Sequence, residues 1–424
     1  RKLDAAAAAA ASTSENDDGE SNNVPERNIV LWSRIDQKSC YKAILSAGLK
    51  CIVLPTKAHP DTDEVSTDLD ALQQALDKYG NKILAVLTTT SCFCPRVPDE
   101  VDKVAKLIQT YNNSNNNTTT TNPQNNNNNA AGGGAGISHV INHAYGLQCP
   151  TTNKLLNRAC TIGRVDAIIC STDKNFLVPV GGALILSPNE DVIAGISKNY
   201  PGRASASPMI DLFITLLSMG LDGYKGILEE RKRLTGLFRT RLEKVAETFG
   251  EQILNCPRNT ISFGITLNKL AVVDTNENSN GDDDSQKQQK QQQQQKERNK
   301  QITQFGSMLF TRCISGTRIV PRNETKTISG HTFVGFGSSH ETYAHDYMTA
   351  ACAVGMCEEE MNEFFIRLEK AWKDYCAKRE KDRKRKQKKK MEKEKEKEKD
   401  EEEKHEGNGT TIEEDVGKMA ISDK

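Results

Sequence analysis

The sequence has no run of about 18 apolar residues and no charged segment leading into a short apolar one, so it predicts neither a membrane span nor a secretory signal. Its 12 cysteines are scattered through a chain of 424 residues, unlike the disulfide framework of a small secreted protein. Cys92 and Cys94 form a lone Cys-x-Cys pair without nearby histidines, so no metal site is predicted. These absences favour a cytoplasmic protein with reduced thiols.

Net charge is also absent, because 57 Lys and Arg balance 57 Asp and Glu. The balance is not local: residues 378–390 hold ten basic and two acidic side chains, a charge of 10 − 2 = +8. Such a segment binds RNA or DNA unspecifically, but Lys/Glu tracts are more often solvated helices or disordered tails. The basic segment alone therefore does not identify a partner.

Four segments contain too few apolar residues to offset the entropy of ordering. We predict disorder for residues 1–23, for two insertions at 112–136 and 274–300, and for a charged tail at 377–424. The rest of the chain is longer than a domain with a single hydrophobic core usually is. We therefore predict two domains, a large one at 24–211 and a smaller one at 212–376.

The large domain alternates apolar strand-like runs with amphipathic helical stretches. The predicted strands are 28–32, 51–54, 83–87, 138–141, 167–170 and 182–186, and the predicted helices are 39–47, 68–79, 101–111 and one from about 153. This alternation is typical of an α/β fold with a mostly parallel sheet, in which ligands bind at the carboxyl ends of the strands.

The smaller domain has a different pattern, typical of an α+β arrangement. Two long helical stripes, 224–249 and 361–375, enclose three candidate strands at 261–267, 309–313 and 332–336.

The strongest local signal is the lysine in the segment STDKNFLVPVGG, which directly follows the strand 167–170. A lysine in a loop at a strand end can have its amine desolvated, which makes it a nucleophile that forms a Schiff base with an aldehyde. An isolated Lys174 would more often be an ordinary surface side chain. A second motif favours the Schiff base.

That motif is NHAYG, which follows the strand 138–141 about 32 residues before Lys174. The cofactor pyridoxal phosphate (PLP) acts as an electron sink when a polar group engages its ring nitrogen, and Asn142 would be that group. An amide cannot keep the ring nitrogen protonated as a carboxylate does, which suits loss of a good β leaving group. Asn142 taken alone would more often just form a turn.

Further polar loops follow the neighbouring strands. Thr88 to Ser91 end the strand 83–87, and the segment WSRIDQKS ends the first strand, so four polar loops are predicted to converge on one edge of the sheet. Arg203 lies in the segment PGRASASP and suits bidentate binding of a phosphate or carboxylate, although it could be a solvated arginine. The convergence favours a PLP site.

Several ordered strings together resemble the O-phosphoseryl-tRNA(Sec) selenium transferase family. They are RIDQKSCYKAILSAGL, TTTSCFCPRVPD, INHAYGLQ, STDKNFLVPVGGA, SKNYPGRASASP, DLFITLLSMG and QFGSMLFTR. The resemblance runs from about Asn28 to Trp372, apart from the two insertions.

The resemblance implies a fold-type I PLP-dependent transferase that converts O-phosphoseryl-tRNA(Sec) into selenocysteinyl-tRNA(Sec) with selenophosphate. Lys174 would bond the cofactor and take the substrate's α-proton; phosphate would leave and selenium would add. Arg203 would bind the substrate phosphate, Asn142 and Gln37 would face the cofactor, and Arg312 would contact the tRNA. The family assembles as a homotetramer with active sites between subunits.

The sequence departs from the family in two places. It has no counterpart of the family's N-terminal region with the loop that grips the phosphoseryl group, so we expect this polypeptide to be inactive alone. Cys160 or Thr161 stands where the family has a basic residue touching tRNA. A cysteine desulfurase or lyase on the same fold explains Lys174 but not the other strings, and a non-catalytic tRNA-binding protein is the alternative of a different class.

Overall fold

The computed structural model describes residues 26–116, 136–200, 202, 205–270 and 284–409. By internal contacts the chain divides into two compact units, the first ending at Phe365 and the second beginning at Ile366. The second unit consists of most of helix α10 (Glu358–Gly409). All the described strands, and with them the candidate site, belong to the first unit.

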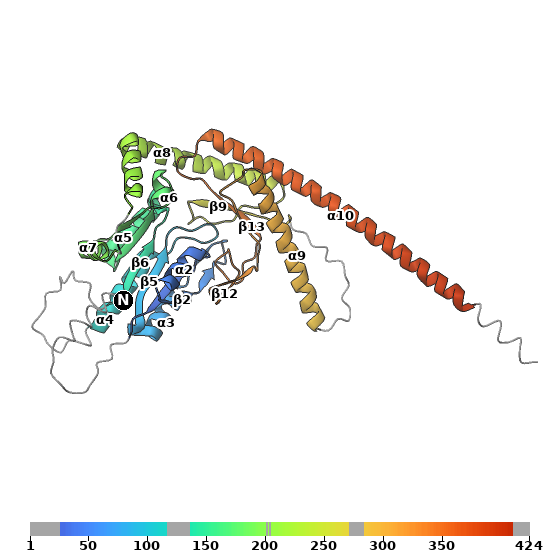
Figure 1. Cartoon of the computed structure of the whole chain (residues 1–424), viewed down its shortest axis with the longest axis horizontal. Helices are drawn as coiled ribbons and strands as arrows, with labels where there is room; N and C mark the ends of the chain where they lie inside the picture. Colours follow the sequence, from blue (N-terminus) through green and yellow to red (C-terminus); the bar gives the residue numbers. More distant parts are fainter. Residues whose placement is uncertain (1–25, 117–135, 201, 203–204, 271–283, 410–424) are drawn as a thin grey trace, which may run out of the picture. The chain divides into compact units, whose positions relative to one another are not determined.

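The first unit contains a six-stranded sheet with the order β2-β1-β5-β6-β7-β8 (Figure 1). Its strands are β1 (Ile29–Ser33), β2 (Lys50–Leu54), β5 (Ile83–Thr89), β6 (Ser138–Asn142), β7 (Ala167–Ser171) and β8 (Ala183–Leu186). The first five pair in parallel, and β8 pairs antiparallel with β7. The predicted mostly parallel sheet is confirmed, and all six strands lie within two residues of their predicted bounds.

Helices and short elements connect these strands. They are α2 (Lys38–Ser46), the hairpin β3 (Thr56–Ala58) and β4 (Val65–Thr67), α3 (Leu69–Tyr79), η1 (Gly80–Lys82), α4 (Val101–Asn116), η2 (Gly146–Gln148), α5 (Pro150–Ile162), α6 (Thr172–Phe176) and α7 (Glu190–Asn199). The four predicted helices of this region are confirmed, with α4 and α5 longer than predicted.

The strand β1 shows how both faces of the sheet are covered. Ile29 and Leu31 pack into a core cluster with residues of α3 and α4. Val30 and Trp32 pack into another cluster with Tyr41 of α2. Because successive strand residues point to opposite faces, alternate side chains of one strand hold helices on the two sides of the sheet.

The rest of the first unit combines helices with small antiparallel sheets, which confirms the predicted α+β character. It contains α8 (Ser207–Thr248), β9 (Ser262–Thr266), α9 (Asp284–Thr311), β10 (Arg318–Val320), the hairpin β11 (Thr325–Ile328) and β12 (His331–Val334), and β13 (Tyr347–Ala351). Three strands pair in the order β10-β13-β9. The predicted boundary after residue 211 falls inside α8, and the two-domain division remains a prediction.

The predicted strand at 309–313 is wrong, because this segment is the end of α9 and the turn after it. Ile302, Phe305 and Leu309 are fully buried at helical spacing. These side chains anchor α9 in the core, and this tertiary packing decides the conformation of a short apolar run that suits a strand equally well.

The predicted disorder of the tract 274–300 is corrected in its second part, which forms the start of α9 from Asp284. Gln and Lys are good helix formers, and a helix already anchored at one end extends without a new nucleation cost. Asn299 also donates to Glu324 at 2.7 Å, and Gln295 to Arg322 O at 2.9 Å. Residues 274–283 lie outside the described residues.

The insertion at 112–136 begins later than predicted, since α4 runs to Asn116. The buried Asn112 accepts from Ile137 N at 2.8 Å and donates to Ile137 O at 3.0 Å, so one side chain joins the two ends of the insertion. The middle of this tract and residues 1–23 lie outside the described residues.

The charged tail is helical rather than disordered as far as Gly409, as part of α10. Lys384 lies 2.8 Å from Glu380, one turn away, and such pairs support a charged helix. The end of the tail, 410–424, lies outside the described residues.

No helix in the described part of the chain combines the length and apolar character needed to cross a membrane. No three His, Cys, Asp or Glu side chains there are grouped so that they could hold a metal ion. Cys92 and Cys94 are buried free thiols.

Candidate active site

Polar turns follow the carboxyl ends of β5, β6 and β7, and main-chain hydrogen bonds join them. Thr90, after β5, donates its N–H to Asn142 O at 3.0 Å. Ser171, at the end of β7, donates its N–H to Ala144 O at 3.0 Å. The predicted convergence of these turns at one edge of the sheet is confirmed, as neighbouring parallel strands require.

Lys174 lies in α6, which begins directly after β7. Its Nζ is 2.9 Å from Asp173 Oδ2, and 43% of its side chain is exposed. The next residue, Asn175, donates to Ala144 O at 2.8 Å and to Ser171 O at 2.7 Å, which fastens this turn to the turn after β6. Lys174 is therefore beside the Asn142 turn, but the described part of one chain does not enclose its amine.

Asn142 and Gln37 meet at the thiol of Cys40. Asn142 Nδ2 lies 3.4 Å from Cys40 Sγ, and the thiol donates to Gln37 Oε1 at 3.8 Å. Burial raises the pKa of Cys40, against an opposing effect of the Asn142 hydrogen bond, so the group between the two amides is a neutral thiol. The first strand's turn thus joins the other three, and both predicted cofactor-facing amides lie at the same place.

Three buried polar atoms in the turns after β6 and β7 have no hydrogen-bond partner among the described residues. They are Tyr145 Oη, Thr172 Oγ1 and Asn175 Oδ1. Buried polar atoms are rarely left unpaired, so two hydroxyls and an amide oxygen in these turns fit a polar ligand such as PLP. Gly182 allows the main chain to pack directly against this turn, because a Cβ there would overlap with Thr172 Oγ1 at 2.5 Å.

Of the other two predicted site residues only Arg312 is described, and it does not join this group. Arg203 lies outside the described residues. Arg312 follows α9 in a turn in which its N–H donates to Leu309 O at 3.1 Å. It lies next to a cleft rather than in the turns around Lys174.

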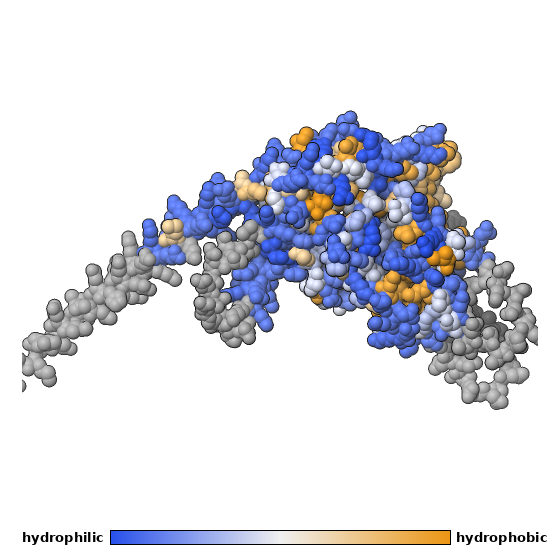
Figure 2. Space-filling model, turned by 180° about the vertical axis from the view of Figure 1, so that it is seen from behind, coloured by the Kyte–Doolittle hydropathy of each residue, from blue (hydrophilic) through white to orange (hydrophobic). Residues whose placement is uncertain are grey.

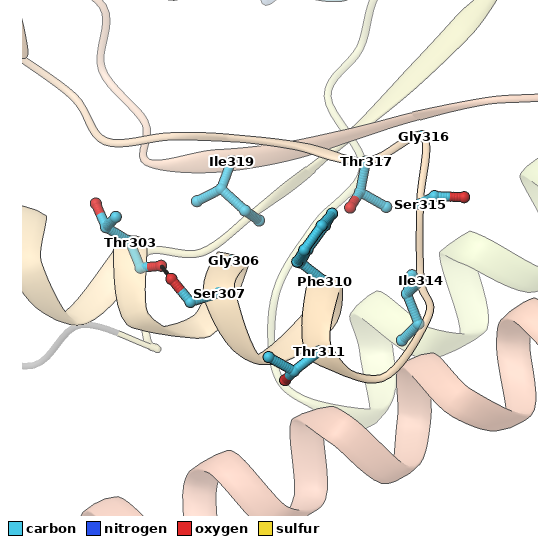
Figure 3. A pocket seen from close by; sticks show the side chains of 10 residues that line it. All are labelled: Thr303, Gly306, Ser307, Phe310, Thr311, Ile314, Ser315, Gly316, Thr317 and Ile319. Atoms are coloured by element: carbon cyan, nitrogen blue, oxygen red, sulfur yellow. Dashed lines mark hydrogen bonds between the residues drawn. The ribbon is translucent and has the colours of Figure 1, made fainter.

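The cleft beside Arg312 has a volume of about 550 Å³. It is lined by Thr303, Gly306, Ser307, Phe310, Thr311, Ile314, Ser315, Gly316, Thr317 and Ile319. Figure 3 shows the Phe310 ring between the end of α9 and the loop that carries Thr317, and 78% of this residue is exposed. Hydroxyl groups and one exposed aromatic face, with no carboxylate in the lining, suit an unpaired nucleotide of RNA.

Sequence reasoning missed two buried polar groups that support the site. His143, inside the NHAYG motif, is completely buried, and its position beside Asn142 was the only signal for it. Arg96 and Asp99 form a buried ion pair of 2.5 Å after β5, and Asp99 Oδ2 accepts from Thr89 N at 2.7 Å. Arg96 also donates to Ser33 Oγ at 2.8 Å, a contact between segments far apart in the sequence that no local pattern reveals.

His139, in the middle of β6, gives the protein a predicted sensitivity to acid. Its ring lies 2.9 Å from the Thr88 hydroxyl and 3.0 Å from Arg164 O, and burial lowers its pKa from 6.5 to about 4. In the unfolded chain His139 therefore binds a proton below about pH 6.5, whereas in the folded chain it binds one only below about pH 4. Between about pH 7 and about pH 4.5, we expect the free energy of unfolding to fall by roughly 2–3 kcal/mol less in His139→Gln than in the wild type, as measured by urea unfolding. An unchanged loss in this variant would contradict the assignment.

The sequence model of the family described as "O-phosphoseryl-tRNA(Sec) selenium transferase, SepSecS" matches residues 21–114 and 133–373. The interruption falls within the predicted insertion at 112–136. Proteins of the same name are similar to this chain: that of Dictyostelium discoideum is 44% identical over 355 residues, 83% of this chain and 66% of its own length. That of Caenorhabditis elegans is 34% identical over 361 residues, 84% of this chain and 64% of its own length. The chain thus spans slightly less than two thirds of these relatives.

Solved structures show the same fold. The archaeal O-phosphoseryl-tRNA(Sec) selenium transferase has a TM-score of 0.62 at 25% identity, covering 81% of this chain and 64% of its own. Oryza sativa TDC, solved with PLP and tryptamine, has a TM-score of 0.53 at 13% identity, covering 88% of this chain and 66% of its own. The second likeness supports the α/β fold of PLP-dependent enzymes alone.

Proposed function

Because the chain belongs to the O-phosphoseryl-tRNA(Sec) selenium transferase family, we propose that it acts in converting O-phosphoseryl-tRNA(Sec) into selenocysteinyl-tRNA(Sec), with PLP as cofactor and selenophosphate as selenium donor. The observation that carries the proposal is the meeting of the Lys174, Asn142 and Gln37 turns at one edge of the sheet. The relatives' printed names supply the reaction.

Lys174 is the residue proposed to bond the cofactor. PLP, when bound, supplies an electron sink for the electrons of a broken bond at the substrate's α-carbon. Asn175 fixes the turn that carries the Lys174 amine, which supports the further proposal that this amine would act as the base that moves the substrate's α-proton. Asn142 and Gln37 would orient the ring with their amides.

Arg203 is proposed to bind the phosphate group of the phosphoseryl substrate, and Arg312 to contact the tRNA. A guanidinium binds a phosphate with two parallel hydrogen bonds. The cleft beside Arg312 supports the second role, since unpaired bases stack on exposed aromatic rings such as Phe310.

We also propose that the protein assembles as a homotetramer. The first half of α8 carries an apolar face that one chain leaves exposed, here named the α8 apolar face: Met209, Ile210, Phe213, Ile214, Leu217 and Leu221, each between 52% and 68% exposed. Figure 2 shows such orange apolar patches on a mostly blue surface. Pro208, at the start of α8, lies next to Gly182 after the Lys174 turn, so a second copy on this face would help to enclose the half-exposed lysine.

The double substitution Phe213→Glu and Leu217→Glu is expected to weaken this association at least about 100-fold, because it removes two large apolar side chains from the interface. Light scattering at micromolar concentration should then report a smaller mass than for the wild type. Ile366→Glu, at a residue 60% exposed on another helix, is the matched control and should not change the mass. An unchanged mass for the double variant would exclude the α8 apolar face as an interface.

The test of the function is incubation of the purified protein, both alone and joined to the part of the Dictyostelium discoideum relative that it does not span, with O-phosphoseryl-tRNA(Sec), PLP and radioactive selenophosphate. The joined form decides the function, because this polypeptide is expected to be inactive alone. Selenium should appear in the tRNA fraction, and omission of PLP should prevent it. Binding of the tRNA without incorporation of selenium would instead support the alternative of a non-catalytic tRNA-binding protein.

A further inference from the structure

His143 is a buried histidine beside Asn142 that the proposed chemistry does not use. It is 0% exposed. Its Nδ1 lies 2.6 Å from the Thr90 hydroxyl, and its Nε2 lies 3.0 Å from Asn153 Oδ1. The ring therefore connects the turn after β5 to helix α5.

The partners of the ring determine where its hydrogen lies. Asn153 uses its Nδ2 to donate to Leu147 O at 2.9 Å, so its Oδ1 is left to accept from His143 Nε2–H. Burial lowers the pKa of His143, which keeps the ring neutral. Nδ1 is consequently an acceptor, and the Thr90 hydroxyl donates to it.

Thr90 in turn holds the main chain of Asn142, because its N–H donates to Asn142 O at 3.0 Å. The side chain of Asn142 is fixed separately: its Oδ1 accepts from Ala144 N at 3.1 Å. This bond directs Oδ1 toward the Ala144 N–H, and the Nδ2–H groups on the other side of the amide remain for another partner; in this structure one of them points to Cys40 Sγ. Asn142 thus presents a hydrogen-bond donor to the candidate site.

We propose that His143 is a positioning residue, which through Thr90 keeps Asn142 as a hydrogen-bond donor to the ring nitrogen of bound PLP, so that this nitrogen stays unprotonated. The inference rests on the proposed function, since it assumes that PLP binds at Lys174. A ring nitrogen that accepts an N–H has its lone pair engaged and cannot carry a proton as well.

Two substitutions separate the two hydrogen bonds of His143. An asparagine places its amide where Nδ1 lies and can still accept from Thr90, whereas a glutamine reaches the position of Nε2 and retains only the contact with Asn153. If His143 acts through Thr90, His143→Asn should resemble the wild type and His143→Gln should not. A role in anchoring α5 alone would give the opposite order.

The measurement is the nitrogen NMR signal of PLP labelled at its ring nitrogen and bound to the purified protein, together with the PLP dissociation constant. We expect an unprotonated, hydrogen-bonded nitrogen in the wild type and in His143→Asn. His143→Gln should shift the signal and weaken PLP binding roughly 5- to 10-fold, the effect of about one hydrogen bond. Asn142→Asp, which places a carboxylate beside the nitrogen, should give the protonated signal for reference.

A protonated nitrogen in the wild type, or equal signals in His143→Gln and the wild type, would overturn this inference alone. If the folded wild-type protein binds no PLP, the proposed function fails and this inference fails with it.

Discussion

Replacement of Lys174 by alanine is expected to lower the rate of selenocysteinyl-tRNA formation by at least about 1,000-fold, because the variant has neither the amine that bonds PLP nor the base for the α-proton. The same substitution should remove the visible absorption band of the protein with PLP. Reduction of the wild-type protein with borohydride should fix the cofactor on the peptide that contains Lys174.

Lys174→Arg separates the roles of charge and nucleophile. It retains a cation beside Asp173, which lies 2.9 Å from the Lys174 amine. A guanidinium does not deprotonate under these conditions, so this variant should be as inactive as the alanine variant. Lys198→Ala, on α7, is the control and should leave both the rate and the absorption band unchanged. An absorption band that survives in Lys174→Ala would place the cofactor on another residue.

The sheet and the order of its polar turns could be predicted because strand patterns are local. The apolar runs of β1, β5, β6 and β7 end at polar residues, such as Asn142 at the end of β6 and Ser171 at the end of β7. In a parallel sheet those ends must lie on one edge. Lys174 and Asn142 were therefore predicted as neighbours from two separate motifs without any knowledge of their contacts.

The errors arose where distant contacts decide the structure. The sequence pattern around Leu309 is compatible with a strand or a helix. The burial of Ile302 and Phe305 in the core favours the helix. The Gln-rich tract before them is ordered because it continues that helix. The link from Gln37 through Cys40 to Asn142 joins residues about a hundred positions apart, which the motifs could not show.

The buried pair of Arg96 and Asp99 is the clearest case of such a distant dependence, and its removal has the largest effect on stability that we predict. Arg96 is 1% exposed and donates to Ser33 Oγ at 2.8 Å and to Arg34 O at 3.1 Å, so it joins the end of β1 to the turn after β5. Asp99 accepts from Thr89 N, at the end of β5. The two residues thus fix the strand ends that carry the candidate site.

Arg96→Met should therefore lower the free energy of unfolding by about 3–5 kcal/mol, because it leaves the Asp99 carboxylate buried without its cation. Urea unfolding followed by tryptophan fluorescence measures this, since Trp32 lies next to Ser33 in β1. The double variant Arg96→Met with Asp99→Asn removes the uncompensated charge while its amide oxygen can still accept from Thr89 N. It should be more stable than Arg96→Met alone, although it carries one more substitution. If the double variant is the less stable of the two, the hydrogen bonds of Arg96, rather than the compensation of a buried charge, hold the ends of β1 and β5 together.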